Sequence, residues 1–195
     1  MTINKIFLIN LFLITILSTA NVNSAGQNNI DSEKIIYLKN QVKDDPDNAQ
    51  ARYLLAKIYQ KNNNIKGAEN EFKKALNLEP GSSKIRFDYA ELLLENWKYQ
   101  ELYKVLDQSF AIEEKEKESK RLALITFAYL GEGKISQAKK TISQAKYLKN
   151  TDKVQLALAK IAAFEGDYKK AAVIIEQLLK KSEDNFDILL LKARL

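Results

Sequence analysis

The residue types that most enzymes use for acid–base and nucleophilic chemistry are missing from this 195-residue sequence. It contains no histidine and no cysteine. Histidine is the usual general base near neutral pH, and both residues are common metal ligands. The sequence therefore excludes Ser-His-Asp and Cys-His hydrolases, thiol catalysis, cysteine-zinc sites, disulfides and a cysteine-linked lipid anchor.

Two clusters of carboxylates remain as candidate metal sites, but their spacing favours other roles. Residues 113–121 read EEKEKESKR, and alternating signs are typical of a solvated helix start with local ion pairs. Asp44, Asp45 and Asp47 surround Pro46. Capping of the next helix explains them better than calcium, because no EF-hand spacing follows. We therefore predict a protein that is not an enzyme and has no cofactor and no metal.

The composition indicates a folded helical protein with a mildly basic surface. Hydrophobic residues make up 46% and charged residues 29%, with 6 Gly and 2 Pro, and so few turn residues argue against an all-β chain. The net charge of +6 comes from 31 basic and 25 acidic residues spread along the chain. Nucleic-acid binders concentrate positive charge on one face or arm, so we predict a solubilising surface and no nucleic-acid partner.

Residues 1–25 have the pattern of a secretory signal peptide. Lys5 precedes an apolar stretch from Ile6 to Leu17, and small residues then offer cleavage after Ala20 or Ala25. Twelve helical residues rise about 18 Å, too little for a bilayer core of about 30 Å. We expect export to the bacterial periplasm or cell envelope, with a disordered lead over 26–31. The alternative is an uncleaved anchor, and membrane contact is expected through that segment or through a partner.

A repeat organises the rest of the chain. Pro46 and Pro80 lie 34 residues apart, and the segment between them contains RYLLAKIY at residues 52–59. The small and aromatic residues that follow are Ala68, Phe72 and Ala75. This segment resembles the tetratricopeptide repeat, whose pattern is W-x2-L-G-x2-Y, then A-x3-F, then P. Arg52 stands at the Trp place.

The resemblance implies an all-α fold, a right-handed α-solenoid of stacked antiparallel helix pairs. We place four repeats at 49–82, 83–118, 119–151 and 152–185, with an N-terminal capping helix over 32–45. Residues 186–195, FDILLLKARL, begin the first helix of a fifth repeat. Without a partner helix, a helix this apolar would leave a hydrophobic surface exposed to water. Either the chain is a fragment of a longer array, or this face docks on something.

The turns inside each repeat call for a residue that tolerates a left-handed backbone. Gly133 and Gly166 fill this place in the third and fourth repeats, and Asp167 is expected to cap the helix that follows. In the second repeat Trp97 stands there, where a positive φ is costly for it. We expect Asn96 to take the left-handed conformation instead. Trp97 is expected to pack between repeats, with a binding hot spot as the alternative.

The first helix of each pair should line the concave face of such an array, and its exposed positions are the candidate partner-binding residues. Aromatic residues among mixed charges suit an extended peptide or a partner helix, and several lysines bias the groove towards acidic segments. The candidates are Tyr53, Lys57, Lys84, Phe87, Glu91, Lys120, Phe127, Lys153 and Lys160.

We therefore predict an exported scaffold that binds a protein or peptide partner in its concave groove. Parts of the first two repeats, such as DPDNAQARYLLAKIYQ, also resemble exported tetratricopeptide proteins of bacterial PEP-CTERM/exosortase systems. That resemblance implies a role in envelope, exopolysaccharide or protein-sorting assembly. The alternative is a structural fragment of a larger envelope machine, in which the repeat array continues and the functional part lies beyond residue 195.

Overall fold

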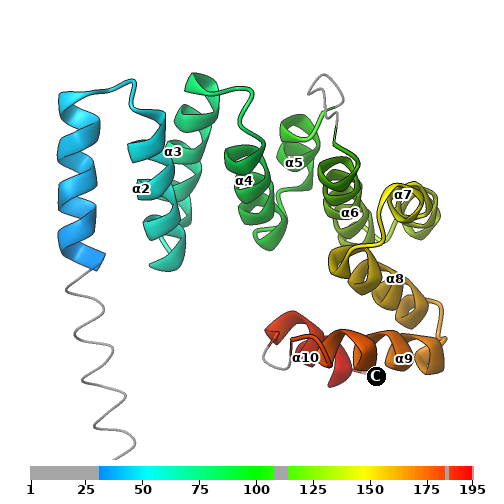
Figure 1. Cartoon of the computed structure of the whole chain (residues 1–195). Coiled ribbons are helices and arrows are strands. Elements are labelled where there is room, and N and C mark those ends of the chain that lie inside the picture. The colour runs from blue at the N-terminus through cyan, green and yellow to red at the C-terminus, as the bar shows by residue number, and fades with distance from the viewer. Residues whose placement is uncertain (1–30, 108–113, 183–184, 195) are drawn as a thin grey trace, which may run out of the picture. The chain divides into compact units, whose positions relative to one another are not determined.

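The computed structural model describes residues 31–107, 114–182 and 185–194, and the regular elements in these ranges are all helices (Figure 1). The expected signal peptide over 1–25 lies outside the described residues, as does nearly all of the expected lead over 26–31. The chain divides into two compact units, Met1–Leu78 and Glu79–Leu195. The prediction of an all-α fold is confirmed for the described residues.

In the part of the chain that is described, unit 1 has a helical stretch over 31–44 followed by the pair α2 (Ala49–Lys61) and α3 (Ile65–Leu78). Leu38 of the first stretch is buried against Leu55 of α2. Small residues sit where the two paired helices must approach closely, and Ala56, Ala68 and Ala75 have no exposed surface. Phe72 fills the space between them and is fully buried. One face of α2 thus packs on α3 and another on the stretch before it.

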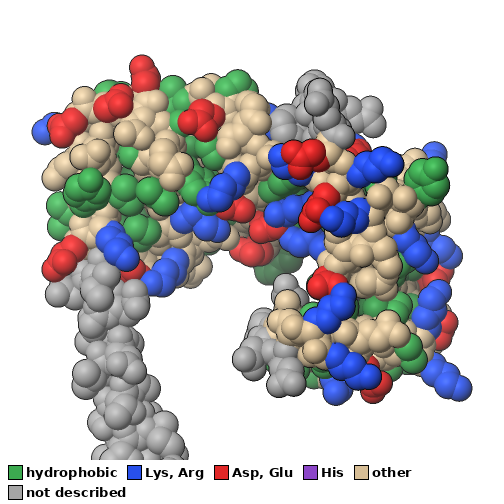
Figure 2. Space-filling model, viewed as in Figure 1, with side chains coloured by type: hydrophobic (Ala, Val, Ile, Leu, Met, Phe, Trp, Pro, Cys, Tyr) green, Lys and Arg blue, Asp and Glu red, His purple; other side chains and the backbone are tan. Residues whose placement is uncertain are grey.

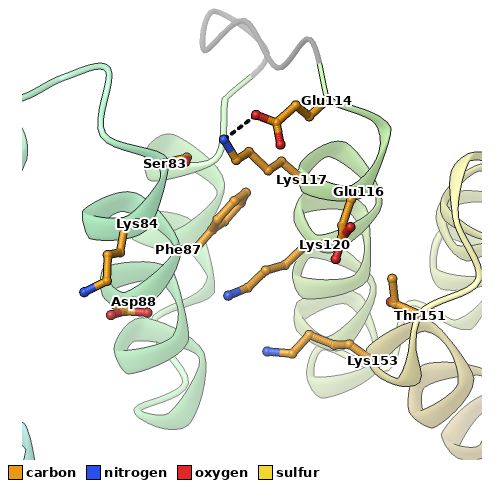
Figure 3. A pocket seen from close by; sticks show the side chains of 10 residues that line it. All are labelled: Ser83, Lys84, Phe87, Asp88, Glu114, Glu116, Lys117, Lys120, Thr151 and Lys153. Carbon is orange, nitrogen blue, oxygen red and sulfur yellow. Dashed lines mark hydrogen bonds and ion pairs between the residues drawn. The ribbon is translucent and has the colours of Figure 1, made fainter.

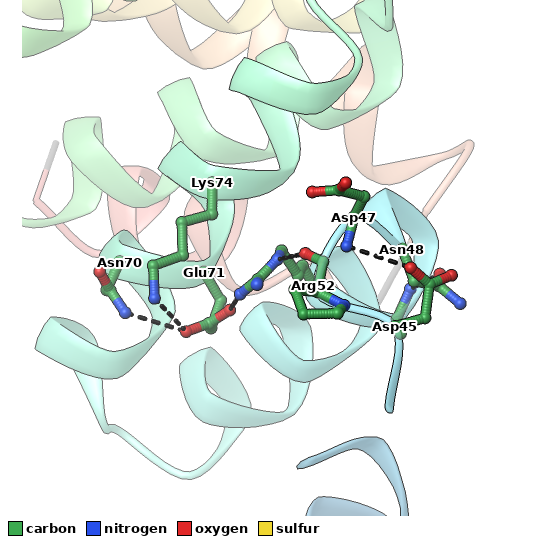
Figure 4. A network of polar contacts seen from close by, with 9 residues as sticks. Asp45, Asp47, Asn48, Arg52, Asn70, Glu71 and Lys74 are labelled. Carbon is green, nitrogen blue, oxygen red and sulfur yellow. Dashed lines mark hydrogen bonds and ion pairs between the residues drawn. The ribbon is translucent and has the colours of Figure 1, made fainter. Parts of the chain in front are cut away.

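Arg52, the residue at the Trp place of the repeat, forms a buried polar network in unit 1 (Figure 4). Its Nη1 lies 2.8 Å from Glu71 Oε2 on α3, and its Nε donates to the Pro46 carbonyl at 2.8 Å. Asn70 and Lys74 lie at the other carboxylate oxygen, at 2.9 and 3.6 Å. The guanidinium therefore ties α2 both to its partner helix and to the turn before it.

The described residues of unit 2 form three helix pairs and a final helix. Its elements are α4 (Ser83–Glu95), α5 (Tyr99–Val105), α6 (Lys115–Gly131), α7 (Ile135–Leu148), α8 (Asp152–Phe164), α9 (Tyr168–Leu179) and α10 (Phe186–Lys192). Consecutive helices pair as α4 with α5, α6 with α7, and α8 with α9, while the first helices α4, α6 and α8 stack on one another in turn.

Two apolar clusters join the helices from α6 to α10 in unit 2. One joins α6, α7 and α8 through residues such as Ile142 and Val154, which are almost fully buried. The other joins α8, α9 and α10, where Ile188 and Leu191 pack against Ile175. The apolar surface expected on α10 is therefore only partly buried, because Leu189 and Leu190 on its other side remain exposed.

A left-handed residue stands at the same place in each turn between paired helices. Asn63, Gly133 and Gly166 have positive φ, and in the second repeat the residue is Trp97, with φ of 56°. The expectation that Asn96 takes this conformation is therefore wrong, since its φ is −101°. Trp97 N–H donates to Leu94 O at 3.1 Å and the next amide to Leu93 O at 2.9 Å.

These two hydrogen bonds explain why Trp97 is left-handed. They form the Schellman pair that satisfies the last carbonyls of a helix, and they close only when the residue at this place has positive φ. Gly166 makes the same bond to Ala163 O, at 3.1 Å. Asp167 then caps α9 by accepting from Lys170 N–H, as expected. The turn geometry thus outweighs the intrinsic preference of Trp97.

The helix pair α4–α5 is tied to α6 by a polar cluster around Glu132. The Tyr103 hydroxyl donates to Glu132 Oε2 at 2.6 Å, and Lys134 Nζ lies 3.1 Å from the same oxygen. Burial, followed by this hydrogen bond, raises the pKa of Tyr103, and the bond lowers the pKa of Glu132. Both shifts keep Tyr103 protonated and Glu132 charged at neutral pH.

The network around Arg52 generates the first prediction. Glu71→Ala should lower the unfolding free energy of the α2–α3 pair by about 3 kcal/mol, because it leaves a buried guanidinium without its carboxylate. Urea denaturation followed by circular dichroism measures the loss, and Lys73→Ala on the exposed side of α3 is the control. A loss below about 1 kcal/mol would show that the ion pair does not hold the two helices together.

The left-handed turn generates the second prediction. Trp97→Gly should stabilise unit 2 by about 1 kcal/mol, because it removes the steric cost of a side chain at positive φ. Asn96→Gly should destabilise it by about 0.5 to 1 kcal/mol, since it also loses the bond from Asn96 Nδ2 to Leu92 O. Thermal unfolding of the two variants tests both signs. Reversed signs would mean that Asn96 is the left-handed residue.

Candidate functional site

The first helices of unit 2 line two hollows on one side of this unit, which we call its inner face. The charged hollow, of about 580 Å³, lies at the N-terminal half of α4 and the starts of α6 and α8 (Figure 3). The aromatic hollow, of about 720 Å³, lies towards the C-terminal ends of the same helices and reaches α10. Figure 2 shows lysine, arginine and acidic side chains intermixed on the face of the molecule that is in view.

An ion-pair bridge separates the two hollows. Oε1 of Glu91 on α4 lies 3.1 Å from Lys120 Nζ on α6 and 2.6 Å from Lys153 Nζ on α8. Lys153 lines both hollows, whereas Lys120 lines the charged one and Glu91 the aromatic one. Partial burial opposes the charge of Glu91, but the two lysines outweigh it and lower the pKa of this carboxyl. The Glu91 carboxyl is therefore charged at neutral pH.

The charged hollow is lined by side chains that already have partners within the chain. Lys117 Nζ lies 2.7 Å from Glu114 Oε1, and Lys120 Nζ lies 5.0 Å from the ring centre of Phe87, a cation–π distance. Lys84 lies beside Asp88 on α4. These pairs compensate most of the positive charge that the sequence places in this hollow.

The aromatic hollow combines an apolar floor with exposed aromatic residues at its edge. Its floor includes Leu124, Phe127 and Leu156, with Lys160 Nζ 5.0 Å from the Phe127 ring centre. At its edge Trp97 is 78% exposed and Phe164 62% exposed. Large aromatic side chains this exposed are typical of surfaces that contact other molecules.

The walls of the aromatic hollow carry opposite charges. Glu91 and Glu95 come from α4 on one side. Lys153 and Lys160 come from α8 on the other side, and Arg194 follows α10. The hollow thus has an acidic wall and a basic wall on either side of an apolar floor.

Seven of the nine sequence-predicted partner-binding residues line these hollows. Those at the charged hollow are Lys84, Phe87, Lys120 and Lys153, and those at the aromatic hollow are Glu91, Phe127, Lys153 and Lys160. Phe87, however, is only 5% exposed, because its ring packs under Lys120. It contributes shape to the charged hollow and offers almost no surface to a partner.

The other two predicted residues, Tyr53 and Lys57, belong to unit 1 and line neither hollow. Tyr53 is 4% exposed, and its ring centre lies 6.1 Å from that of Phe72. It is therefore a core residue of the α2–α3 pair. Lys57 Nζ donates to Gln60 Oε1 at 3.3 Å on the same helix.

The exposed aromatic edge of this hollow was not predicted from the sequence. Trp97 does not pack between repeats as expected, since most of its surface is exposed. Phe164 and Tyr168 also line the aromatic hollow and were not considered. Their signal in the sequence is an aromatic residue on each side of a glycine-containing turn, FEGDY at residues 164–168.

Searches for metal sites and membrane spans give negative results over the part of the chain that is described. There, no group of three or more Asp or Glu residues could hold a metal ion. Among the same residues, no helix combines the length and hydrophobicity needed to cross a bilayer.

Comparison with known proteins identifies the fold. The model of the tetratricopeptide repeat family matches residues 49–82, and no curated protein sequence matches the chain. Three similar solved structures are PilF of Pseudomonas aeruginosa, the type IV pilus biogenesis factor PilW, and YrrB, described as a TPR protein with an unusual peptide-binding site.

The structural similarity to these proteins is extensive, although the sequence identity is low. PilF is 24% identical with a TM-score of 0.63, over 86% of this chain and 76% of PilF. PilW is 18% identical with a TM-score of 0.66, over 91% and 82%. YrrB is 14% identical with a TM-score of 0.58, over 88% of each chain. The family match over residues 49–82 and these shared folds confirm the predicted helix-pair solenoid, so the described helix pairs have the tetratricopeptide-repeat fold.

Proposed function

We propose that this protein is an exported, non-enzymatic scaffold that binds a protein or peptide partner on the inner face of unit 2. The observation that carries the proposal is the aromatic hollow of about 720 Å³ with exposed Trp97 and Phe164 at its edge. Concave, mostly apolar surfaces with a few placed charges are the usual form of binding sites. Tetratricopeptide folds commonly serve protein–protein interaction, and YrrB is described as having a peptide-binding site.

The bridge between the hollows supports a partner that carries carboxylates. Glu91 holds Lys120 and Lys153 at salt-bridge distance. A carboxylate of the partner has the same chemistry as Glu91 and can exchange with it between the two lysines. The proposed preference for an acidic partner therefore arises at Lys120 and Lys153, and it requires the partner carboxylate to displace Glu91.

Export and an envelope role are part of the same proposal. They are supported by the signal-peptide pattern over residues 1–25 and by the fold shared with PilW, a pilus biogenesis factor. The resemblance of the first two repeats to exported PEP-CTERM/exosortase tetratricopeptide proteins favours exopolysaccharide or protein-sorting assembly.

A second candidate function is that of a structural module in a larger envelope assembly. The observation that favours it is the exposed pair Leu189 and Leu190 on α10. An apolar strip of this kind is more stable when another element covers it. This function would place the partner contact on α10 and leave the aromatic hollow empty.

Photo-crosslinking in the host tests the proposed function. A photoreactive phenylalanine analogue should replace Phe164 in the aromatic hollow, and in a second strain Tyr147, which is 91% exposed on α7 and lines neither hollow. We expect a discrete protein product from the Phe164 probe and none from the Tyr147 probe. Equal labelling at both positions, or no product at either, would contradict binding on the inner face.

Glu91→Gln tests the exchange at the bridge. The variant should bind an acidic peptide more tightly than the unchanged chain, about two- to fivefold, because two lysines lose their internal carboxylate. Titration calorimetry with one acidic peptide and its amidated Gln counterpart measures this, and the Gln peptide should show no gain. Equal or weaker binding of the acidic peptide would mean that Lys120 and Lys153 are not its contact.

The same variant has a predictable pH dependence. The pKa of Glu91 is lowered on folding, so its stabilisation is complete above the unfolded value of about 4.3 and is lost as the pH falls through the folded value. The difference in unfolding free energy between the unchanged chain and Glu91→Gln should therefore be at most about 1 kcal/mol at pH 7, given the partial exposure, and should shrink below pH 4. A difference that grows in acid would contradict the assigned ion pairs.

A further inference from the structure

The aromatic hollow is poor in neutral groups that could bind the backbone of an extended peptide. Among its described lining residues none is Asn, Gln, Ser or Thr. Its neutral hydrogen-bonding groups are the hydroxyls of Tyr99 and Tyr168 and the indole N–H of Trp97. Of its charged groups, Glu91 and Lys153 already pair with each other, and Lys160 Nζ lies 5.0 Å from the ring centre of Phe127. An extended backbone would therefore have to compete with these contacts for hydrogen-bond partners.

This shortage discriminates between two forms of a bound segment. An extended segment exposes a backbone N–H and C=O at every residue, and burying them without partners costs free energy. An α-helix satisfies its own backbone groups and presents side chains alone. A hollow with an apolar floor and few neutral polar groups therefore favours a helix whose apolar side faces Leu124, Phe127 and Leu156.

The charges of the two walls define the rest of the partner. Glu95 lies on the α4 side, and Lys160 and Arg194 lie on the side of α8 and α10. A helix seated between them is best matched when basic residues flank its apolar stripe towards α4 and acidic residues flank it towards α8. The reverse orientation would set like charges against each other on both walls.

From these observations we infer that the aromatic hollow takes an amphipathic α-helix of the partner, basic along one edge of its apolar stripe and acidic along the other. The inference rests on the proposed function, because it names the partner that the inner face of unit 2 binds. Trp97 and Phe164 then cover the apolar side chains of that helix at the edge of the hollow. The acidic edge of the helix meets Lys160 and approaches the bridge at Lys153.

Selection from two peptide libraries against the purified chain tests this inference. The two libraries have the same length and residue set, but one is displayed on the surface of a helical scaffold and the other carries a central proline that prevents helix formation. We expect the enriched sequences to come from the helical library, with Lys or Arg along one edge of an apolar stripe and Asp or Glu along the other. Trp97 is the single Trp of the chain, so its fluorescence reports binding at the hollow.

Variants at exposed positions separate the hollow from other surfaces. Phe164→Ala should weaken the selected peptides at least tenfold, as expected when a large aromatic contact of an interface is truncated. Tyr147→Ala, the matched change of an exposed aromatic residue on α7, should leave their affinity unchanged. Glu95→Lys should weaken them two- to fivefold, and changing the facing Lys of the peptide to Glu should restore the loss.

Three outcomes would overturn the inference. Enriched peptides from the proline library that still depend on Phe164 would mean that the segment is extended, while binding on the inner face would stand. Peptides insensitive to Phe164→Ala, or no enriched peptides at all, would mean that the hollow does not bind a helix. A chain that is dimeric in analytical ultracentrifugation and becomes monomeric with Phe164→Asp would mean that a second copy fills the hollow.

Discussion

A single left-handed residue in each turn between paired helices determines where the rest of a repeat lies. The two Schellman bonds reverse the chain directly after the first helix, so that the second helix packs behind it. Asn63, Gly133 and Gly166 take this conformation at little cost. Because each second helix lies behind its partner, the first helices α4, α6 and α8 line the hollows of unit 2. The inner face is thus a consequence of turn geometry.

The charges on this inner face already have partners within the chain. Glu91 pairs with lysines on two successive first helices, and Lys160 lies over the ring of Phe127. Ion pairs that are partly exposed contribute little to affinity or stability. The main favourable free energy for the proposed binding is therefore expected from removing apolar and aromatic surface from water. The charges are left to set the orientation of the partner.

The sequence predicted the helix pairs because their signal is local and periodic, and it predicted the site less well because the site is not local. The spacing of small and aromatic residues such as Ala68 and Phe72 follows directly from how two helices pack. A first helix, however, contacts several neighbours, so periodicity alone does not tell whether Phe87 faces a partner or lies under Lys120. Glu91 and Lys153 are 62 residues apart, and only the stacking of α4, α6 and α8 brings them together.

Trp97 shows how folding and binding make opposite demands on one residue. Its backbone is strained, and its side chain is mostly exposed, so the fold gains little from either feature. The repeats that follow have Gly133 and Gly166 at the same left-handed place in the turn. A residue that breaks a local rule without a gain within the fold points to a role outside it. The place of Trp97 at the edge of the aromatic hollow, which Phe164 also lines, gives the proposed binding a physical form: a rigid aromatic surface for the apolar side of the inferred helix.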